Sequence, residues 1–370
     1  MDSFKGCLGS DEANKAAERG VLDVFPDAEV VKFPVSDGGE GLLNAFSHLF
    51  SLKKVTVRVH NPLMKPMDGY YYMTEDGATA FVELAVASGL PLLDESERNP
   101  LVTTTYGTGE LIADALHHGC RNFVIGIGGS ATNDAALGLL RALGFCFKDK
   151  DGNELNDCSG RVLKEVMRVD KEHVFPELEE CKFEVACDVS NPFCGEDGAV
   201  RVFAPQKGAD EMMIKQLEDG MQSFSNVVAE TTGKDIARMP GAGAAGGVGG
   251  SLYAFLNAQL KPGIELMLDK LDFDNKIGEA ILVITGEGSA DRQTLMGKVP
   301  SGIMKRAMKQ HIPTVLLAGI VNDLKTLQDA GFRQVICINP SGMSTAEMMR
   351  ADTAKHNIRQ VVGDLMNRLR

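Results

Sequence analysis

Apolar and amphipathic segments alternate along the last ninety residues of the chain. Residues 281–286 (ILVITG), 313–319 (PTVLLAG) and 334–339 (QVICIN) are near-continuous apolar runs, which predict buried strands. Segments with helical periodicity at 297–310, 322–330 and 344–369 follow them. Because strands that alternate with helices form parallel sheets covered on both faces, this region predicts an α/β domain.

The earlier part of the chain predicts a second domain. The pattern indicates helices at 11–25 and 41–50 and strands at 30–35 and 53–59, and then two alternating segments that flank Glu75, Asp76 and Gly77. This last pattern is a hairpin signal, which does not fit a simple doubly wound sheet. Strands at 122–127 and 182–187 and helices at 109–118, 133–143, 209–230 and 244–260 follow. We therefore expect a mixed α/β domain at 61–279, inserted into a domain made of residues 1–60 and 280–370.

Composition and charge exclude several classes of protein. The chain has 38 Lys and Arg against 51 Asp and Glu, a formal net charge of −13, and no basic block. Nucleic-acid binding is therefore not expected, and nothing attracts the chain to an anionic membrane. The first residues have no apolar core, so no signal peptide is expected, and the sequence has no apolar run of about 18 residues. Its eight cysteines form no CxxC pair, so we expect reduced thiols and a cytoplasmic location.

Carboxylates and glycines follow several of the expected strands. In open parallel sheets, ligands bind beyond the carboxyl ends of strands, so these residues are the first candidates for a site. Each segment alone is also compatible with a tight turn and a helix cap. The candidates after the four strands at 30–35, 122–127, 182–187 and 281–285 are Asp37, Gly38 and Gly39; Gly128, Gly129, Ser130, Asn133 and Asp134; Asp188 and Asn191; and Glu287, Asp291 and Lys298.

Together these residues indicate phosphoryl transfer. Exposed N–H groups in glycine turns bind phosphate, and carboxylates hold Mg²⁺ or accept a proton from a hydroxyl group. Lys298 and Lys5 lie in glycine-containing turns and are candidates to neutralise charge on the transferred group. The preferred proton acceptor is Asp188, because it follows a buried-looking strand, and Asp291 is the second choice.

Two other sequence patterns carry less weight. Gly241, Gly243 and Gly246 form a GxGxxG pattern, but a polar segment with Pro240 precedes it, so the dinucleotide-binding interpretation fails. A loop that cradles phosphate and a loop that packs closely on a helix both remain open for this segment. Lys207 precedes a helix and is expected to be a solvated surface lysine.

The chain resembles the bacterial glycerate kinases. The matching stretches occur in the family's order and cover nearly the whole chain: DSFKG, VSDGGEG, NPLVTTTYGTGELI, GIGGSATNDAALGLLRALG, ACDVSNPFCG, PQKGAD, PGAGAAGG and TGEGSADRQTLMGKVP. The resemblance implies ATP-dependent phosphorylation of D-glycerate to 2-phosphoglycerate. It also implies a flavodoxin-like domain built from both chain ends, an inserted restriction-endonuclease-like domain, and an active site in the interdomain cleft.

The resemblance supplies the expected ligands and roles. ATP and Mg²⁺ are the expected cofactors, D-glycerate is the small-molecule substrate, and the oligomeric state stays open. Mg²⁺ is expected on Glu287 or Asp37, and the turn at residues 128–130 is expected to receive the substrate carboxylate. Asp2 and Ser3, in DSFKG, are further binding candidates.

The chain departs from the family pattern in two informative places. The family begins with a short apolar strand where this sequence has Met1, so Asp2 and Lys5 are expected to be poorly anchored. Ser289 stands where the family commonly has Arg. Three alternatives stay open: a kinase of another small hydroxy acid, a non-catalytic nucleotide-binding or regulatory protein of this fold and, least favoured, a dinucleotide oxidoreductase.

Overall fold

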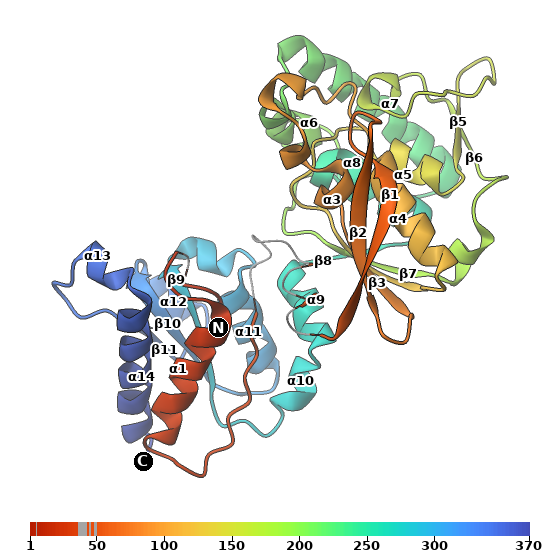
Figure 1. The fold of residues 1–370 in the computed structure, drawn as a ribbon. Coiled ribbons are helices and arrows are strands. Elements are labelled where there is room, and N and C mark those ends of the chain that lie inside the picture. The colour runs from red at the N-terminus through yellow and green to blue at the C-terminus, as the bar shows by residue number, and fades with distance from the viewer. Residues whose placement is uncertain (5, 36–42, 44–45, 48–49) are drawn as a thin grey trace. The chain divides into compact units, whose positions relative to one another are not determined.

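A computed structural model describes residues 1–4, 6–35, 43, 46–47 and 50–370 of the chain (Figure 1). The chain divides into two compact units. Unit 1 comprises Met1–Glu40 and Ile264–Arg370, and unit 2 comprises Gly41–Gly263. Among the described residues, no helix is long and apolar enough to cross a membrane. All eight cysteines are free thiols.

Unit 1 is built on a parallel sheet in the order β11-β10-β9. The strands are β9 (Val283–Ala290), β10 (Thr314–Val321) and β11 (Gln334–Cys337). Side chains of β10 alternate between two cores, with Val315 and Leu317 on one face and Leu316 and Ala318 on the other. This alternation buries both faces of the sheet, so the expectation of a covered parallel sheet is confirmed.

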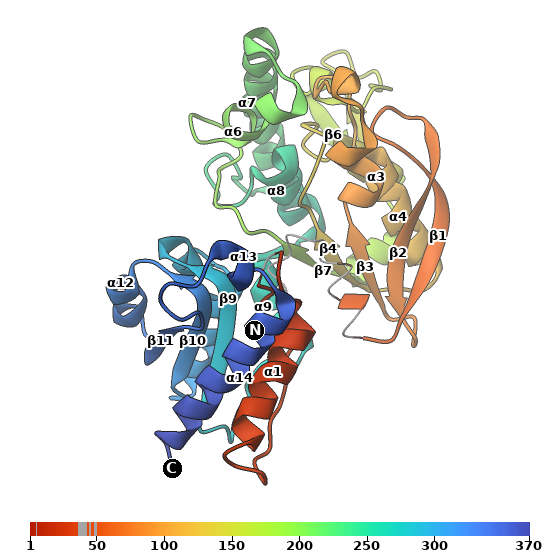
Figure 2. The same cartoon turned by 60° about the vertical axis from the view of Figure 1, so that its left-hand side comes forward.

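Helices cover each face of this sheet. Helices α1 (Ser10–Leu22) and α14 (Ala351–Asn367) lie side by side on the face that carries Val315 and Leu317 (Figure 2). Their contact is close, because a Cβ atom on Gly20 would lie 2.5 Å from the carbonyl oxygen of Arg359. The other helices of unit 1 are α9 (Gly263–Lys270), α10 (Phe273–Lys276), α11 (Val299–Lys309), α12 (Leu324–Asp329) and α13 (Thr345–Met348), with the 3₁₀ turn η6 (Arg292–Leu295).

Unit 2 contains a six-stranded mixed sheet in the order β1-β2-β3-β4-β7-β8. Strands β1, β2 and β3 are antiparallel, and β3, β4, β7 and β8 are parallel. The bounds are β1 (Leu52–His60), β2 (Pro66–Thr74), β3 (Thr79–Glu83), β4 (Asn122–Gly126), β7 (Lys182–Ala186) and β8 (Gln259–Lys261). The expected hairpin at residues 75–77 joins β2 to β3, where Gly77 adopts a left-handed φ of 71°.

Helices and a small ribbon pack with the sheet of unit 2 around one large apolar core. The ribbon pairs β5 (Cys146–Lys148) with β6 (Arg168–Asp170). The helices are α3 (Ala85–Ser88), α4 (Tyr106–His117), α5 (Leu137–Ala142), α6 (Ala199–Phe203), α7 (Glu211–Thr232) and α8 (Ala244–Leu256). Single 3₁₀ turns lie at η1 (Leu90–Leu92), η2 (Glu95–Glu97), η3 (Gly160–Val162), η4 (Pro176–Glu180) and η5 (Pro205–Lys207).

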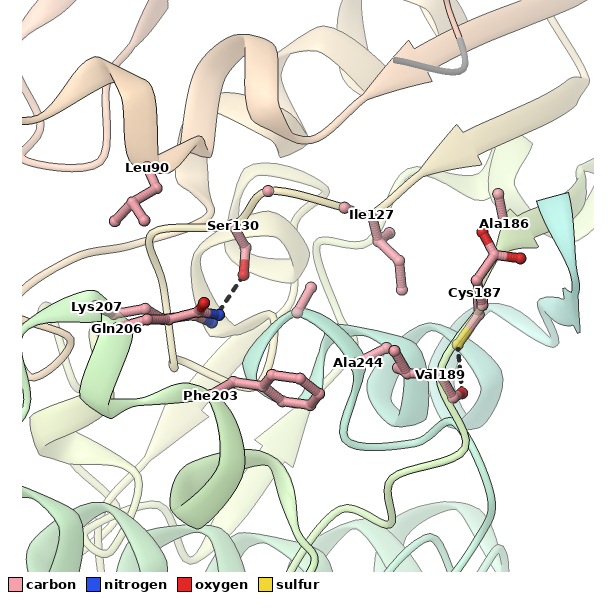
Figure 3. A pocket seen from close by; sticks show the side chains of 14 residues that line it. Leu90, Ile127, Ser130, Ala186, Cys187, Val189, Phe203, Gln206, Lys207 and Ala244 are labelled. Atoms are coloured by element: carbon pink, nitrogen blue, oxygen red, sulfur yellow. Dashed lines mark hydrogen bonds between the residues drawn. The ribbon is translucent and has the colours of Figure 1, made fainter. Parts of the chain in front are cut away.

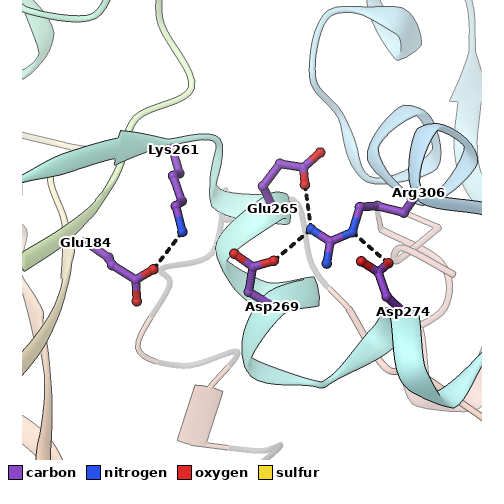
Figure 4. Close-up of polar contacts among 6 residues, drawn as sticks. All are labelled: Glu184, Lys261, Glu265, Asp269, Asp274 and Arg306. Atoms are coloured by element: carbon purple, nitrogen blue, oxygen red, sulfur yellow. Dashed lines mark hydrogen bonds and ion pairs between the residues drawn. The ribbon is translucent and has the colours of Figure 1, made fainter. Parts of the chain in front are cut away.

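The units divide earlier in the chain than the sequence predicts, so that β1 at the first boundary and both α9 and α10 at the second belong to the other unit. Strand β1 pairs with β2 along its whole length, so it belongs to the inserted unit rather than to the first domain. At the second boundary, Arg306 of α11 binds Glu265 and Asp269 of α9 and Asp274 of α10 (Figure 4). These contacts attach α9 and α10 to unit 1, whereas the Lys261–Glu184 ion pair lies within unit 2.

The strand expected at residues 30–35 is absent from the structure. Two of its backbone groups pair with α1 side chains instead of with another strand. Asn14 Nδ2 donates a hydrogen bond to the Phe33 carbonyl at 3.2 Å, and the Val35 N–H donates to Ser10 Oγ at 3.0 Å. The helix expected at 41–50 lies mostly outside the described residues.

Candidate functional site

Unit 1 carries a pocket of about 300 Å³ at the carboxyl-terminal parts of β9 and β10 and just after β11. Polar side chains from the start of the chain and from the region of β9 form one part of its wall. Ile320, Ile338, Met348 and Met349 form an apolar part. Asn339 also lines it and is held in place, because its Nδ2 donates to the Gly319 carbonyl at 2.8 Å. The polar side chains are Asp2, Ser3, Glu287, Ser289 and Lys298.

Glu287 is a buried carboxylate of this pocket, with 5% of its surface exposed. Thr294 Oγ1 donates a hydrogen bond of 2.5 Å to its Oε1, and Lys298 Nζ lies 3.9 Å from its Oε2. Burial raises the pKa of Glu287 to about 7, and the Thr294 bond and Lys298 oppose this shift. The group can therefore change its charge near neutral pH when a cation or anion enters the pocket.

Asp2 lines the same pocket and is firmly anchored, contrary to expectation. Its N–H donates to the Gly286 carbonyl at 2.8 Å, and the Met1 ammonium group donates to Asn14 Oδ1 at 3.1 Å. Met1 and Asp2 are each only 3% exposed. The prediction of a loose terminus is therefore wrong for Asp2, while Lys5 lies outside the described residues.

Asp291, the second candidate for the proton acceptor, lies beside this pocket, where its contacts are with residues of η6. Its Oδ1 accepts a hydrogen bond from the Gln293 N–H at 2.8 Å, and its own N–H donates to Thr294 Oγ1 at 3.1 Å. It caps η6 and does not line the pocket. Asp291 therefore positions Thr294, which in turn holds Glu287.

Unit 2 carries a second pocket, of about 270 Å³, beyond the ends of β4 and β7 (Figure 3). Gly128, Gly129 and Ser130 follow β4, and Asp188 follows β7. The two glycines are exposed, and the backbone N–H groups of residues 128–130 donate no hydrogen bond to any described residue. This turn therefore presents free donors beside an exposed carboxylate.

Lys207, at the end of η5, is buried in this pocket and not solvated, so the sequence prediction for it is wrong. Its side chain is only 2% exposed, and its Nζ donates to Ser130 Oγ at 2.8 Å and to the Thr132 carbonyl at 2.6 Å (Figure 3). Burial lowers the pKa of Lys207 to about 7, and the charge of Asp134 partly opposes that shift. Lys207 lies in the short segment 205–208, which is not part of a regular apolar pattern, so nothing in the sequence indicates that it is buried.

The side chain of Asp188 is fixed by a backbone donor. The Gly263 N–H donates to Asp188 Oδ1 at 2.8 Å, and a Cβ atom on Gly263 would lie 3.3 Å from Oδ2. The nearby Asn191 points elsewhere, because its Nδ2 donates to the Asp197 carbonyl at 2.9 Å. Asp188 is thus the carboxylate that the structure brings together with the glycine turn.

Asp134 organises the loop that follows the glycine turn. It is fully buried, and its oxygens accept hydrogen bonds from Thr105 N–H at 2.7 Å, from Thr105 Oγ1 at 2.8 Å and from three weaker donors. Burial raises its pKa, and the Thr105 donors oppose that shift. Neither Asp134 nor the fully buried Asn133 lines the pocket.

Close packing accounts for two of the glycines in the GxGxxG pattern. A Cβ atom on Gly243 would lie 2.1 Å from the Pro192 carbonyl oxygen, and one on Gly246 would lie 2.3 Å from that of Thr132. Gly246 also has a φ of +69°, which side chains disfavour. Of the two interpretations left open for this loop, these contacts favour packing.

The described residues contain no group of three or more His, Cys, Asp or Glu side chains placed to hold a metal ion. Asp37, Gly38 and Gly39, three of the predicted ligand-binding residues, lie outside the described part of the chain. Of the two predicted Mg²⁺ ligands, Glu287 and Asp37, the structure therefore describes the surroundings of Glu287.

Comparison with known proteins identifies the family of the chain. The model of the "Glycerate kinase family" matches residues 1–370. The chain is 44% identical to the glycerate 2-kinase of Escherichia coli K12 over 322 residues, which is 87% of this chain and 84% of that protein. It is 41% identical to a glycerate kinase of Bacillus cereus over 358 residues, 96% and 93% of the two chains.

A solved structure extends the likeness to the fold. A crystal structure from Salmonella typhimurium LT2, described as a glycerate kinase 2, aligns with a TM-score of 0.83 and 37% identity. The alignment covers 100% of this chain and 98% of that one. The protein is therefore an enzyme of the kinase class. It belongs to the glycerate kinase family, and the resemblance found in its motifs is confirmed.

Proposed function

We propose that the protein transfers the γ-phosphoryl group of ATP to the 2-hydroxyl group of D-glycerate, which gives ADP and 2-phosphoglycerate. The relatives named above are glycerate kinases, and one of them is a glycerate 2-kinase. The observation that carries the proposal is the pair of strand-end pockets, one with Glu287 and Lys298 and the other with Asp188 and a glycine turn. A cytoplasmic location goes with this proposal, because ATP is supplied there.

The pocket of unit 1 suits a nucleotide. Its apolar wall of Ile320, Ile338, Met348 and Met349 offers a surface for a planar base, and Asn339 supplies polar atoms beside it. Lys298 supplies positive charge for phosphate oxygens, which need it most as the phosphoryl group is transferred. Apolar and charged groups in one pocket are what a nucleoside triphosphate requires.

The residues around Glu287 fit a magnesium ion that arrives with ATP. Mg²⁺ commonly binds one or two carboxylates and keeps waters and phosphate oxygens as its other ligands. Glu287 and Asp2 are two carboxylates that line one pocket, and each raises the energy of the other's charged form. We assign Mg²⁺ to these two side chains, where it would neutralise phosphate charge.

The pocket of unit 2 suits a small hydroxy acid. In our proposal, Asp188 accepts the proton of the 2-hydroxyl group as that oxygen attacks the γ-phosphorus atom. The bond between this phosphorus and the bridging oxygen breaks, and ADP leaves with that electron pair. The hydrogen bond from the Gly263 N–H fixes the orientation of Asp188 for this role.

A coupled assay tests the reaction. ADP release is measured with ATP and D-glycerate, with ATP alone, and with other small hydroxy acids. We expect release that depends on D-glycerate and a product that enolase converts directly, as it does 2-phosphoglycerate. ATP binding without any ADP release would instead select a non-catalytic protein, and faster release with another acid would change the assigned substrate.

The variant Asp188→Asn tests the assigned base. Loss of a general base typically lowers kcat by about 10²- to 10⁴-fold, and we expect a fall in this range with a small change in the KM for ATP. Asp197→Asn is a matched control, because Asp197 is a nearby exposed carboxylate that uses only its backbone carbonyl in the loop. Near-normal turnover by Asp188→Asn would remove Asp188 from the mechanism.

A further inference from the structure

Lys207 is a buried cation with neutral partners. Its two hydrogen bonds go to a hydroxyl group and a backbone carbonyl, and the charge of Asp134 opposes the effect of burial only in part, because no described carboxylate is within ion-pair distance of Lys207. Burying an ammonium group without a direct ion-pair partner is costly. A protein retains such a group most readily where an anion joins it in the working state.

The surroundings of Lys207 leave room for that anion. An ammonium group has three N–H donors, and Ser130 and Thr132 account for two of them. Lys207 lines the pocket together with Gly128 and Gly129, whose backbone N–H groups donate to no described residue. A charged donor and free amide donors therefore face one cavity, which is how proteins bind oxyanions.

We infer that Lys207, with the turn at residues 128–130, binds an oxyanion of the substrate and sets the preference of the enzyme for acids over uncharged polyols. The inference rests on the proposed function in one respect, namely that the oxyanion belongs to the substrate D-glycerate. In Figure 3, Lys207 and Ser130 lie on one side of the pocket, and Ala186 and Cys187, which precede Asp188, lie on the other. A 2-hydroxy acid carries both groups that this lining would recognise, a carboxylate for Lys207 and, on the adjacent carbon, a hydroxyl group for Asp188.

The same donors would also suit a phosphate group of the nucleotide, so the experiment must separate the two sources. The variant Lys207→Met keeps most of the side-chain volume and removes the charge. Hydrogen bonds to charged groups contribute enough that we expect the KM for D-glycerate to rise by about 10- to 100-fold. The KM for ATP should change less than about twofold if the oxyanion is the carboxylate.

The control is Lys215→Met, which removes the charge of an exposed lysine on α7. It should leave both KM values unchanged. A rise confined to the KM for ATP in Lys207→Met would assign the donors to a nucleotide phosphate and overturn the acid-binding role. Unchanged values for both substrates would overturn the inference as a whole.

A second measurement does not depend on whether the variant Lys207→Met folds. With the unaltered enzyme, D-glycerate and its uncharged amide are compared as ligands by calorimetry, together with ADP. We expect the amide to bind at least about tenfold more weakly than D-glycerate, because it cannot pair with the ammonium charge. Equal affinity for the acid and its amide would contradict the inference even if Lys207→Met did not fold.

These tests separate the inference from the proposed function. If the unaltered enzyme releases ADP with D-glycerate but Lys207→Met behaves normally, the inference fails and the function stands. If the unaltered enzyme binds D-glycerate through Lys207 but releases no ADP, the oxyanion site stands and the proposed reaction fails.

Discussion

At the scale of single residues, burial decides the chemistry of the two pockets. Glu287 and Lys207 are ordinary ionisable side chains whose pKa values burial moves toward neutrality from opposite directions. Each is held by a hydroxyl group, Thr294 for the acid and Ser130 for the base. The pockets therefore hold groups that a bound charge can switch at the pH where the enzyme works.

The lowered pKa of Lys207 predicts how the free energy of unfolding depends on pH. Its pKa is about 7 in the folded chain against 10.5 for an unperturbed lysine, so between these values the unfolded chain binds more protons. The free energy of unfolding should therefore rise with pH in this window, by up to about 1.4 kcal/mol per pH unit from this group. Lys207→Met should make the rise shallower in urea denaturation from pH 7 to pH 10. An unchanged slope would show that Lys207 titrates normally.

The sequence predicted pocket residues correctly where they directly follow an apolar segment. Glu287, Lys298, Asp188 and the glycine turn all line pockets as predicted from their position after apolar runs. Lys207 was missed, because burial of a lysine depends on contacts with Ser130 and Thr132, about 75 residues earlier in the chain. The catalytic roles themselves stay predictions.

At the scale of elements, periodicity predicted helices and paired strands well. Helix α7 and strands β9 and β10 lie where the pattern placed them, because each buries one face or both faces of a regular element. The segment 30–35 has the apolar character of a strand but pairs with Asn14 and Ser10 side chains of α1. Apolar character in a short segment does not show which groups satisfy its backbone, and here it does not show burial either, because Val31 is exposed.

Gly246 and Gly128 differ in how closely other atoms surround them, and one variant of each can separate a packing role from a binding role. Gly246→Ala would place its Cβ 2.3 Å from the Thr132 carbonyl oxygen at a left-handed φ of +69°, whereas a Cβ on Gly128 meets no heavy atom within 4 Å. We expect Gly246→Ala to lower the free energy of unfolding by about 2–5 kcal/mol, from backbone strain and overpacking.

Gly128→Ala should instead leave stability within about 0.5 kcal/mol and raise the KM for D-glycerate, because it narrows the pocket beside the free amide donors. Urea denaturation and steady-state kinetics measure the two effects. A destabilised Gly128→Ala with normal kinetics would reverse the assignment and make the turn structural.

At the scale of the whole molecule, Arg306 attaches α9 and α10, which follow the second boundary between the units, to the rest of unit 1. The Arg306 side chain is 11% exposed and binds three carboxylates from α9 and α10, which raise its pKa. The sequence could not place this boundary, because the expected domain limit depended on apolar periodicity and the contacts of α9 and α10 with α11 are polar.

The variant Arg306→Met tests this role. It removes the guanidinium group that binds Glu265, Asp269 and Asp274, and we expect a loss of about 2–4 kcal/mol of stability. Arg58→Met is the control, because Arg58 forms an exposed pair with Asp68 that should contribute less than about 1 kcal/mol. Equal chemical denaturation curves for the two variants would show that the cluster is only a surface network.

The contact between α1 and α14 has a consequence for biosynthesis. Asp23 and Arg359 form an ion pair although their positions differ by 336, so α1 is synthesised long before the helix that it packs against. Ala13, Ala16 and Ala17 therefore lack the cover of α14 while residues 41–263 are already synthesised. The inserted unit can begin to fold while the unit that surrounds it in the sequence is still incomplete.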